Sequence, residues 1–187
     1  MPDAPLHPED LDATAFFGVS LAVLGHPVKH SISPAIHNAA LAEMAKTDST
    51  FAAWRYHRVD TPAERLPEAL PKLRAAGFRG LNLTIPHKVQ AMDLVDALSP
   101  EAERIGAVNT LIAPAPSTSP SDSSSGWRGD NTDGRGFQEA VRRDLDADLA
   151  SAKVILLGAG GAARAAASRC LLADCAELRI GNRSPER

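Results

Sequence analysis

The chain has 187 residues, of which 44% are hydrophobic, and its 20 basic and 23 acidic residues are scattered along it. This length allows one full domain, or one small domain and part of another, with enough apolar residues for a core. The charges are nearly balanced, and the basic residues do not form the clustered patch that is typical of a nucleic-acid-binding protein. No apolar run approaches the ~20 residues of a membrane helix. We therefore expect neither a nucleic-acid nor a membrane partner.

The first 19 residues carry acids and prolines where a signal peptide needs a basic start and an apolar run. We interpret residues 1–19 as a leader before the first strand. The two cysteines, Cys170 and Cys175, lie in an Ala/Leu-rich stretch, and nothing else in the chain indicates secretion. Free thiols and a cytoplasmic location are the expectation.

Strand and helix patterns alternate from residue 20 onward. Strands are predicted at 20–25, 51–59, 79–84 and 107–113, and helices at 34–45, 62–77, 86–98 and 99–106. Such alternation favours an α/β protein with a parallel or mixed sheet covered on both faces. We expect residues 20–130 to form this first domain.

A Ser/Pro-rich segment at 114–126 is low in complexity and predicts a surface loop. A helix that starts near Gly134 or Arg135 then links two domains across residues 131–150. The second domain spans 151–187 and, from Lys153, shows the order strand, glycine turn, helix, strand.

Gly158, Gly160 and Ala163 fit the G-x-G-x-x-G/A pattern between an apolar strand and a helix. Such a turn lets the backbone approach a pyrophosphate, to which the helix N-terminus offers free N–H groups. The next strand ends at Gly181 and is followed by Arg183 rather than by the acid that usually holds the ribose of NAD. We therefore predict NADP, although exposed arginines at a chain end are also common.

Polar side chains lie at or near the ends of several predicted strands in the first domain and just before the linking helix. They are Ser31 and Ser33, then Asn82, Thr84 and Lys88, then Asn109 and Thr110, and finally Asn131 and Asp133. Ligands of open α/β sheets lie beyond the carboxyl ends of the strands, so these groups are expected to converge on a small polyhydroxylated acid. Lys88 and Asp133 either transfer protons in a ketone reduction, form a structural ion pair, or do not meet. Spacing alone leaves these alternatives open.

In order and spacing, HSISP, NLTIPHK, GAVNT, GDNTDG, GAGGAA and NRSPER resemble the motifs of the shikimate dehydrogenase family from about Leu21 to Arg187. The resemblance implies a shikimate-binding domain followed by the first βαβ unit of a Rossmann NADP-binding domain. It implies NADPH-dependent, reversible reduction of 3-dehydroshikimate to shikimate, on the route to chorismate and the aromatic amino acids.

The resemblance also assigns roles to residues of this chain. Ser31 and Ser33 would hold the carboxylate of shikimate, and Thr84 and Asn109 would position its ring. Lys88 and Asp133 would be the catalytic pair and would also contact the substrate. The cofactor residues would be Gly158, Ala159, Gly160, Gly161 and Ala162 for the pyrophosphate, and Asn182, Arg183, Ser184 and Arg187 for the 2′-phosphate end.

Two departures from the family pattern matter. His87 stands beside Lys88, where relatives often carry an aromatic or another residue, and receives no role. The chain also ends before a two-halved dinucleotide fold can be completed. We therefore expect a fragment that exposes apolar surface beyond Ala150 and lacks part of the nicotinamide pocket.

Two alternatives to this function remain from the sequence. One is a quinate/shikimate dehydrogenase that prefers NAD, and the other is a non-catalytic binding protein on the same fold. The histidines His26, His30 and His37 lack the ligand spacing of a metal site, so no metal is expected. A homodimer is the one protein assembly that we expect.

Overall fold

The computed structural model describes residues 4–11, 16, 18–114 and 126–184. Most of the predicted Ser/Pro-rich loop lies outside these residues, and so does Arg187. Within them, no helix combines the length and the apolar character needed to cross a bilayer. Cys170 and Cys175 are free thiols, as predicted, and Cys170 is buried.

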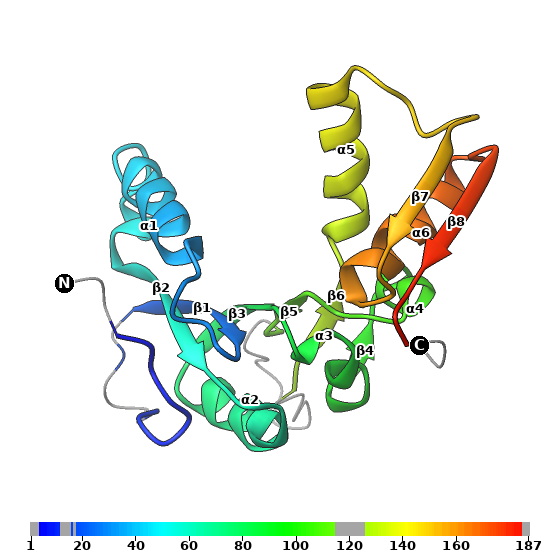
Figure 1. Ribbon diagram of the computed structural model, residues 1–187. Coiled ribbons are helices and arrows are strands. Elements are labelled where there is room, and N and C mark those ends of the chain that lie inside the picture. The colour runs from blue at the N-terminus through cyan, green and yellow to red at the C-terminus, as the bar shows by residue number, and fades with distance from the viewer. Residues whose placement is uncertain (1–3, 12–15, 17, 115–125, 185–187) are drawn as a thin grey trace.

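A six-stranded mixed sheet has the order β2-β1-β3-β5-β6-β4 (Figure 1). The parallel part consists of β1 (Val19–Gly25), β2 (Trp54–Asp60) and β3 (Phe78–Leu83). Next come β5 (Thr110–Ile112), antiparallel to β3, and β6 (Arg128–Asp130), antiparallel to β5, with β4 (Ala97–Leu98) parallel to β6 at the edge. The sheet is therefore mixed, as the sequence pattern allows.

Helices cover both faces of the parallel part of the sheet. The helices α1 (Ser33–Met44) and α2 (Leu66–Ala75) lie on opposite faces (Figure 1). Because successive strand residues point to opposite faces, Leu24 of β1 packs in the core on the α2 side, and the adjacent Val23 packs in a smaller cluster with Leu41 of α1. The apolar run of β1 is thus buried from both sides.

The remaining short elements connect the strands. They are the 3-10 helices η1 (Ser49–Ala53), η2 (Ala63–Arg65) and η3 (Ala91–Leu94), and the α-helices α3 (His87–Gln90) and α4 (Pro100–Ile105). In α4, Pro100 follows the N-cap Ser99, whose hydroxyl accepts a hydrogen bond from the backbone N–H of Ala102, and Gly106 ends the helix with a φ of 66°.

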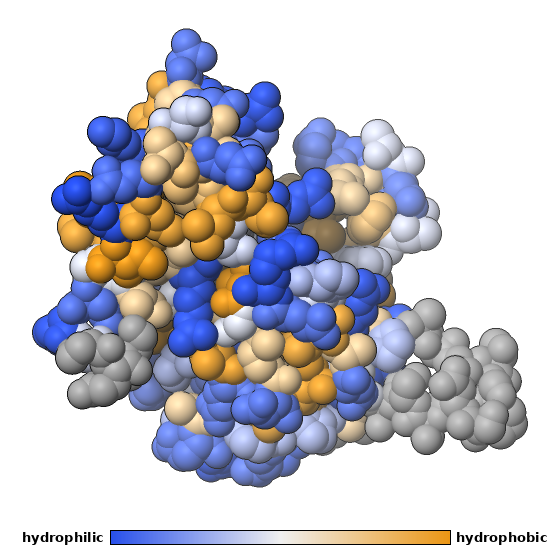
Figure 2. Space-filling model, turned by 90° about the vertical axis from the view of Figure 1, so that its right-hand side faces the viewer, coloured by the Kyte–Doolittle hydropathy of each residue, from blue (hydrophilic) through white to orange (hydrophobic). Residues whose placement is uncertain are grey.

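A second, two-stranded sheet pairs β7 (Lys153–Leu157) with β8 (Glu177–Gly181) in parallel, joined through α6 (Gly161–Leu172). Alternate residues of β7 differ in exposure: Val154 and Leu156 are half-buried, whereas Ile155 and Leu157 are 70% and 87% exposed. Apolar side chains gather on the surface of the lobe that carries these strands (Figure 2). Apolar surface beyond Ala150 is therefore exposed, as expected.

The two sheets are held together through α5 (Asp133–Leu145) and α6. A Cβ atom on Gly134 would lie 3.1 Å from the carbonyl oxygen of Ala165, so glycine allows α5 and α6 to approach closely. Ala165 also belongs to a buried cluster with Ile105 and Ala107, and Arg169 forms an ion pair with Glu101 of α4 at 3.2 Å. This packing places the glycine turn that precedes α6 beside the first sheet.

Three predicted elements differ from the structure. Residues 51–53 belong to η1, whose N-cap Asp48 accepts a hydrogen bond from the Thr50 N–H, so the strand begins at Trp54. The helix predicted over 86–98 is shorter: α3 ends at Gln90 and η3 at Leu94, because Ala97 and Leu98 form β4 and pair with β6. The strand β6 itself was missed, since three residues are too short for a periodic pattern.

Candidate active site

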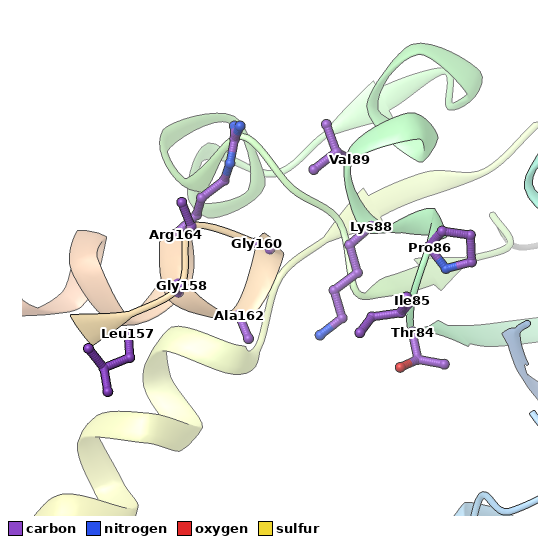
Figure 3. A pocket seen from close by; sticks show the side chains of 13 residues that line it. Thr84, Ile85, Pro86, Lys88, Val89, Leu157, Gly158, Gly160, Ala162 and Arg164 are labelled. Carbon is purple, nitrogen blue, oxygen red and sulfur yellow. The ribbon is translucent and has the colours of Figure 1, made fainter. Parts of the chain in front are cut away.

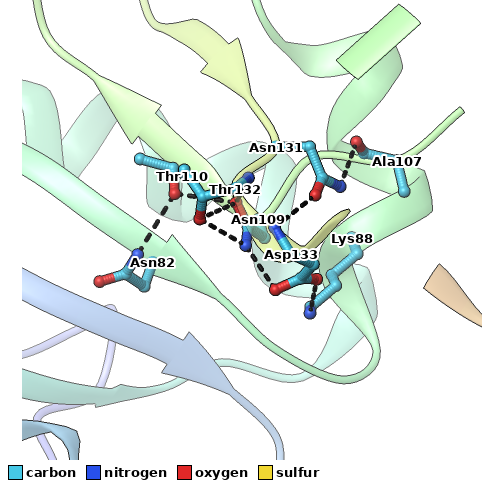
Figure 4. A network of polar contacts seen from close by, with 8 residues as sticks. All are labelled: Asn82, Lys88, Ala107, Asn109, Thr110, Asn131, Thr132 and Asp133. Atoms are coloured by element: carbon cyan, nitrogen blue, oxygen red, sulfur yellow. Dashed lines mark hydrogen bonds and ion pairs between the residues drawn. The ribbon is translucent and has the colours of Figure 1, made fainter. Parts of the chain in front are cut away.

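Lys88 and Asp133 form an ion pair, with 2.6 Å between Nζ and Oδ2 (Figure 4). Lys88 lies on α3, just beyond β3, and Asp133 is the first residue of α5, where a carboxylate interacts favourably with the helix dipole. The two side chains are 18% and 28% exposed, so each remains accessible to a small ligand. Of the three alternatives that the sequence left open, the structure excludes the one in which these residues do not meet.

Two buried asparagines hold Asp133 in place, one through its carboxylate and the other through its backbone N–H. Asn109 donates from Nδ2 to Oδ1 of Asp133 at 2.7 Å. Asn131 accepts from the backbone N–H of Asp133 at 3.0 Å and donates to the carbonyl of Ala107 at 2.8 Å. Because Asn109 and Asn131 are only 7% and 2% exposed, the start of α5 has little freedom to shift.

The polar network continues from Asn109 away from the ion pair. Asn109 Oδ1 accepts from the Thr110 hydroxyl at 2.9 Å, and Thr110 Oγ1 accepts from Asn82 at 3.4 Å. Asn82 in turn accepts from the Tyr56 hydroxyl at 2.7 Å. The sequence assigned no role to Tyr56. Its pattern predicts that Tyr56 lies in a strand, but it does not show that the Tyr56 hydroxyl contacts Asn82 on β3.

Ser31 and Ser33 lie where β1 leads into α1. The Ser31 hydroxyl accepts from the backbone N–H of Ser33 at 3.3 Å, and the Ser31 carbonyl accepts two hydrogen bonds from Arg58, at 2.9 and 2.7 Å. Both serines are half-buried. The structure brings them together as a pair, but within the described part of the chain none of their hydrogen bonds joins them to the network around Asp133.

A cavity of about 720 Å³ separates the end of β3 from the glycine turn (Figure 3). One wall consists of Thr84, Ile85, Pro86, Lys88 and Val89, and the other of Leu157, Gly158, Ala159, Gly160, Gly161, Ala162, Ala163 and Arg164. Its volume lies within the usual range for small-molecule sites. Lys88 and the predicted pyrophosphate-binding residues therefore line one space.

The glycine turn fits a phosphate group. Gly158 has a φ of 113°, which side-chain-bearing residues rarely adopt, and no atom lies within 4 Å of a Cβ built on Gly158 or Gly160. The turn therefore leaves open space in front of α6, a helix of 12 residues whose N-terminal N–H groups are suited to an anion.

The predicted 2′-phosphate residues follow β8. Asn182 donates to the carbonyl of Ser184 at 2.6 Å, and Arg183 is exposed. The described residues from Gly181 to Ser184 include no acid that would repel a phosphate.

His87, beside Lys88, is fully buried, and among the residues that the structure describes neither of its ring nitrogens forms a hydrogen bond of good geometry, although the Thr61 backbone lies near the ring. Burial lowers the pKa of this imidazole below its ordinary value, and the nearby His26 acts in the same direction, while the Thr61 backbone and Asp60 oppose it. His87 therefore stays a neutral ring in the core and takes no part in the ion pair.

An ammonium–carboxylate pair across a cavity from a dinucleotide-type turn provides the acid–base groups and the cofactor turn that a nicotinamide-dependent dehydrogenase requires. A family model, the shikimate dehydrogenase substrate binding domain, matches residues 23–111. The shikimate dehydrogenase (NADP(+)) of Moorella thermoacetica is 41% identical over 167 residues, which cover 89% of this chain and 51% of the relative. That of Methanopyrus kandleri is also 41% identical, with 89% and 52% covered.

Solved structures agree with these relatives. Shikimate 5-dehydrogenase from Thermus thermophilus, in complex with NADP(H) and shikimate, matches with a TM-score of 0.73 and 41% identity over 90% of this chain and 57% of that chain. The enzyme from Listeria monocytogenes, in complex with shikimate and NAD, matches with a TM-score of 0.73 and 29% identity, covering 90% and 53%. Residues 23–111 thus belong to the shikimate dehydrogenase family, and the chain spans about half the length of the curated relatives it matches.

Proposed function

We propose that this protein interconverts 3-dehydroshikimate and shikimate with NADP as cofactor. The observation that carries the proposal is the Lys88–Asp133 ion pair, at 2.6 Å, on the wall of a cavity whose opposite wall is the glycine turn. This arrangement brings a proton donor and a dinucleotide-binding turn to one space, as reduction of a ketone requires. A non-catalytic binding protein would need no such pair.

Lys88 and Asp133 act as the acid–base pair. When the ketone is reduced, its carbon gains a hydride and its oxygen gains a proton, and the Lys88 ammonium is placed to donate that proton. Asp133 holds the ammonium in position and balances its charge, while Asn109 fixes the carboxylate. In the oxidation direction the same groups accept the proton of the alcohol.

The other predicted substrate residues surround this pair. Thr84 lines the same cavity as Lys88, and Asn109 contacts Asp133, which supports the assignment of both residues to the ring of the substrate. Ser31 and Ser33 are assigned to the carboxylate of the substrate. Hydroxyl and backbone donors of this kind stabilise a buried carboxylate by charge-assisted hydrogen bonds.

The reduced cofactor, NADPH, would supply the hydride that the reduction requires, and NADP+ would take it back in the oxidation direction. Residues from Gly158 to Ala162 would hold its pyrophosphate, and Asn182, Arg183 and Ser184 its 2′-phosphate end, with Arg187 assigned there from the sequence alone. We place residues 20–130 in the substrate domain, 131–150 in the linking helix and 151–187 in the cofactor domain. A cytoplasmic location and a homodimer belong to the same proposal.

The proposal is tested by titrating the 187-residue chain with shikimate and with quinate, and by measuring turnover with NADP and with NAD. Because the chain spans about half of its relatives, turnover is measured in a chimera that continues after Arg187 with the remaining residues of the Moorella relative. We expect preference for shikimate and for NADP. Preference for quinate and NAD would support the alternative enzyme, and binding without turnover would support a binding protein.

A further inference from the structure

The hydrogen bonds that lead from Tyr56 to Asp133 run in one direction, which is set by two groups with fixed roles. The Asp133 carboxylate only accepts, and the backbone N–H of Thr132 only donates. Asn109 contacts both, at 2.7 Å through Nδ2 and at 3.0 Å through Oδ1. Its amide therefore has one orientation, with the nitrogen toward Asp133 (Figure 4).

This orientation determines the next two side chains. Asn109 presents its oxygen to Thr110, so the single hydroxyl proton of Thr110 is used there, at 2.9 Å. Thr110 must then accept from Asn82, whose Nδ2 lies 3.4 Å from Thr110 Oγ1. Asn82 consequently turns its oxygen toward Tyr56, whose hydroxyl donates to it at 2.7 Å.

Tyr56 is built into the fold as a fixed donor. Its side chain is 5% exposed, and its ring stacks on His37 of α1 with 4.2 Å between centroids and 5° between planes. The Asn38 side chain bonds to both the backbone N–H and the carbonyl of Tyr56, at 2.8 and 2.9 Å. Burial raises the pKa of the Tyr56 hydroxyl, so it keeps its proton at neutral pH.

Asn82 has a second amide hydrogen, and this hydrogen has no partner among the residues that the structure describes. Asn82 is half-buried near the end of β3, two residues before Thr84. Residues two apart in an extended strand share a face, and Thr84 lines the cavity together with Lys88. The free N–H of Asn82 is therefore available to a ligand at this end of the strand.

We propose that Tyr56 is a positioning residue for the substrate: its hydroxyl fixes the Asn82 amide so that Asn82 donates to an oxygen of shikimate. The inference rests on the proposed function. Without the Tyr56 hydroxyl, the oxygen of Asn82 loses its donor, and the amide can turn to present an acceptor where the substrate needs a donor.

The test compares shikimate affinities of the 187-residue chain in a double-mutant cycle. Tyr56→Phe keeps the ring that stacks on His37 and removes only the hydroxyl, and it should weaken shikimate binding about three- to tenfold, the factor of one neutral hydrogen bond. In the Asn82→Ala background the same change should have no further effect. Affinity for NADP and the melting temperature serve as controls and should change little.

Equal shikimate affinity of the wild type and Tyr56→Phe overturns the inference, and so does a loss that persists in full in the Asn82→Ala background. If Tyr56→Phe does not fold, the wild-type chain still decides the matter by NMR. The side-chain amide signals of Asn82, identified by their loss in Asn82→Ala, should shift on addition of shikimate. If the chain binds shikimate and the Asn82 signals do not shift, the inference about Tyr56 is wrong. If the wild-type chain binds no shikimate, the proposed function is wrong, and the inference about Tyr56 falls with it.

Discussion

Replacing His87 by leucine should stabilise the fold, because it removes a buried polar ring that forms no hydrogen bond of good geometry with any residue that the structure describes. His87 is 0% exposed, and both of its ring nitrogens lack a hydrogen-bond partner in residues 4–11, 16, 18–114 and 126–184. An unsatisfied buried polar group costs about 1–3 kcal/mol. Leucine fills a similar volume without that cost, so we expect the free energy of unfolding at neutral pH to rise by about 1 kcal/mol or more.

The same substitution should change how stability depends on pH. The folded-state pKa of His87 is lowered, so between that value and the unfolded value of about 6.5 the unfolded chain binds more protons than the folded one. The free energy of unfolding is therefore not reduced by protonation of His87 above about pH 6.5, and it decreases as the pH falls from there toward the folded-state pKa. His87→Leu should lack this loss.

Urea denaturation at about pH 7.5 and at about pH 5.5 measures both effects. A gain of 1 kcal/mol should also raise the melting temperature by roughly 2–4 °C for a chain of this size. His7→Gln, at an exposed position, is the matched control and should keep the wild-type difference between the two pH values. If His87→Leu loses as much unfolding free energy on acidification as the wild type does, the burial of a neutral His87 is not the cause of that loss.

Three further predictions concern the proposed reaction. Lys88→Met in the chimera should lower shikimate turnover by about 100- to 10,000-fold, the usual contribution of a general acid–base group, with NADP affinity nearly unchanged; steady-state kinetics would expose a structural role if turnover fell only a few-fold. Replacing Ser31 and Ser33 by alanine should weaken shikimate binding, at about 1.5–3 kcal/mol for each hydrogen bond to a charged partner, and calorimetric titration showing wild-type affinity would place the carboxylate elsewhere. Arg183→Ala should weaken NADP and leave NAD almost unaffected, and equal losses for both in the same titration would mean that Arg183 contacts a group common to the two.

The sequence predicted the strands that carry the site better than the contacts between them. The ends of β1 and β3 follow from apolar runs, so the positions of Ser31 and Lys88 could be predicted as loop or helix-start positions. Whether Lys88 meets Asp133 depends on β5 and β6, which run antiparallel and bring the start of α5 back to β3. The three-residue β6 carries no periodic signal, and the 2.6 Å ion pair could therefore not be derived from spacing.

Tyr56 is another residue whose secondary structure could be predicted from the sequence while its contact could not. Its strand was predicted, but a hydroxyl finds its partner through sheet register, here across β1 from β2 to Asn82 on β3. His87 is a second case: a histidine beside a candidate catalytic lysine has an obvious polar interpretation, and only the packing shows that its ring is fully enclosed. Burial of a polar side chain is a tertiary property that a local pattern does not contain.

Lys88 is held from several sides, by the segment before β5 and by the starts of α5 and α6, which explains why its ammonium has a defined place. Its backbone carbonyl accepts from the N–H of Val108, two residues before β5, at 2.7 Å, and its ammonium meets Asp133 at the start of α5. Its aliphatic stem lies against the start of α6, where a Cβ on Gly161 would come within 3.1 Å of the Lys88 Cβ and 3.2 Å of its Cδ. The glycine at position 161 thus serves two needs together, since its missing side chain leaves room both for a phosphate at the helix N-terminus and for the lysine that faces it. Docking of α6 on α4 and α5 is therefore part of the geometry of the candidate active site.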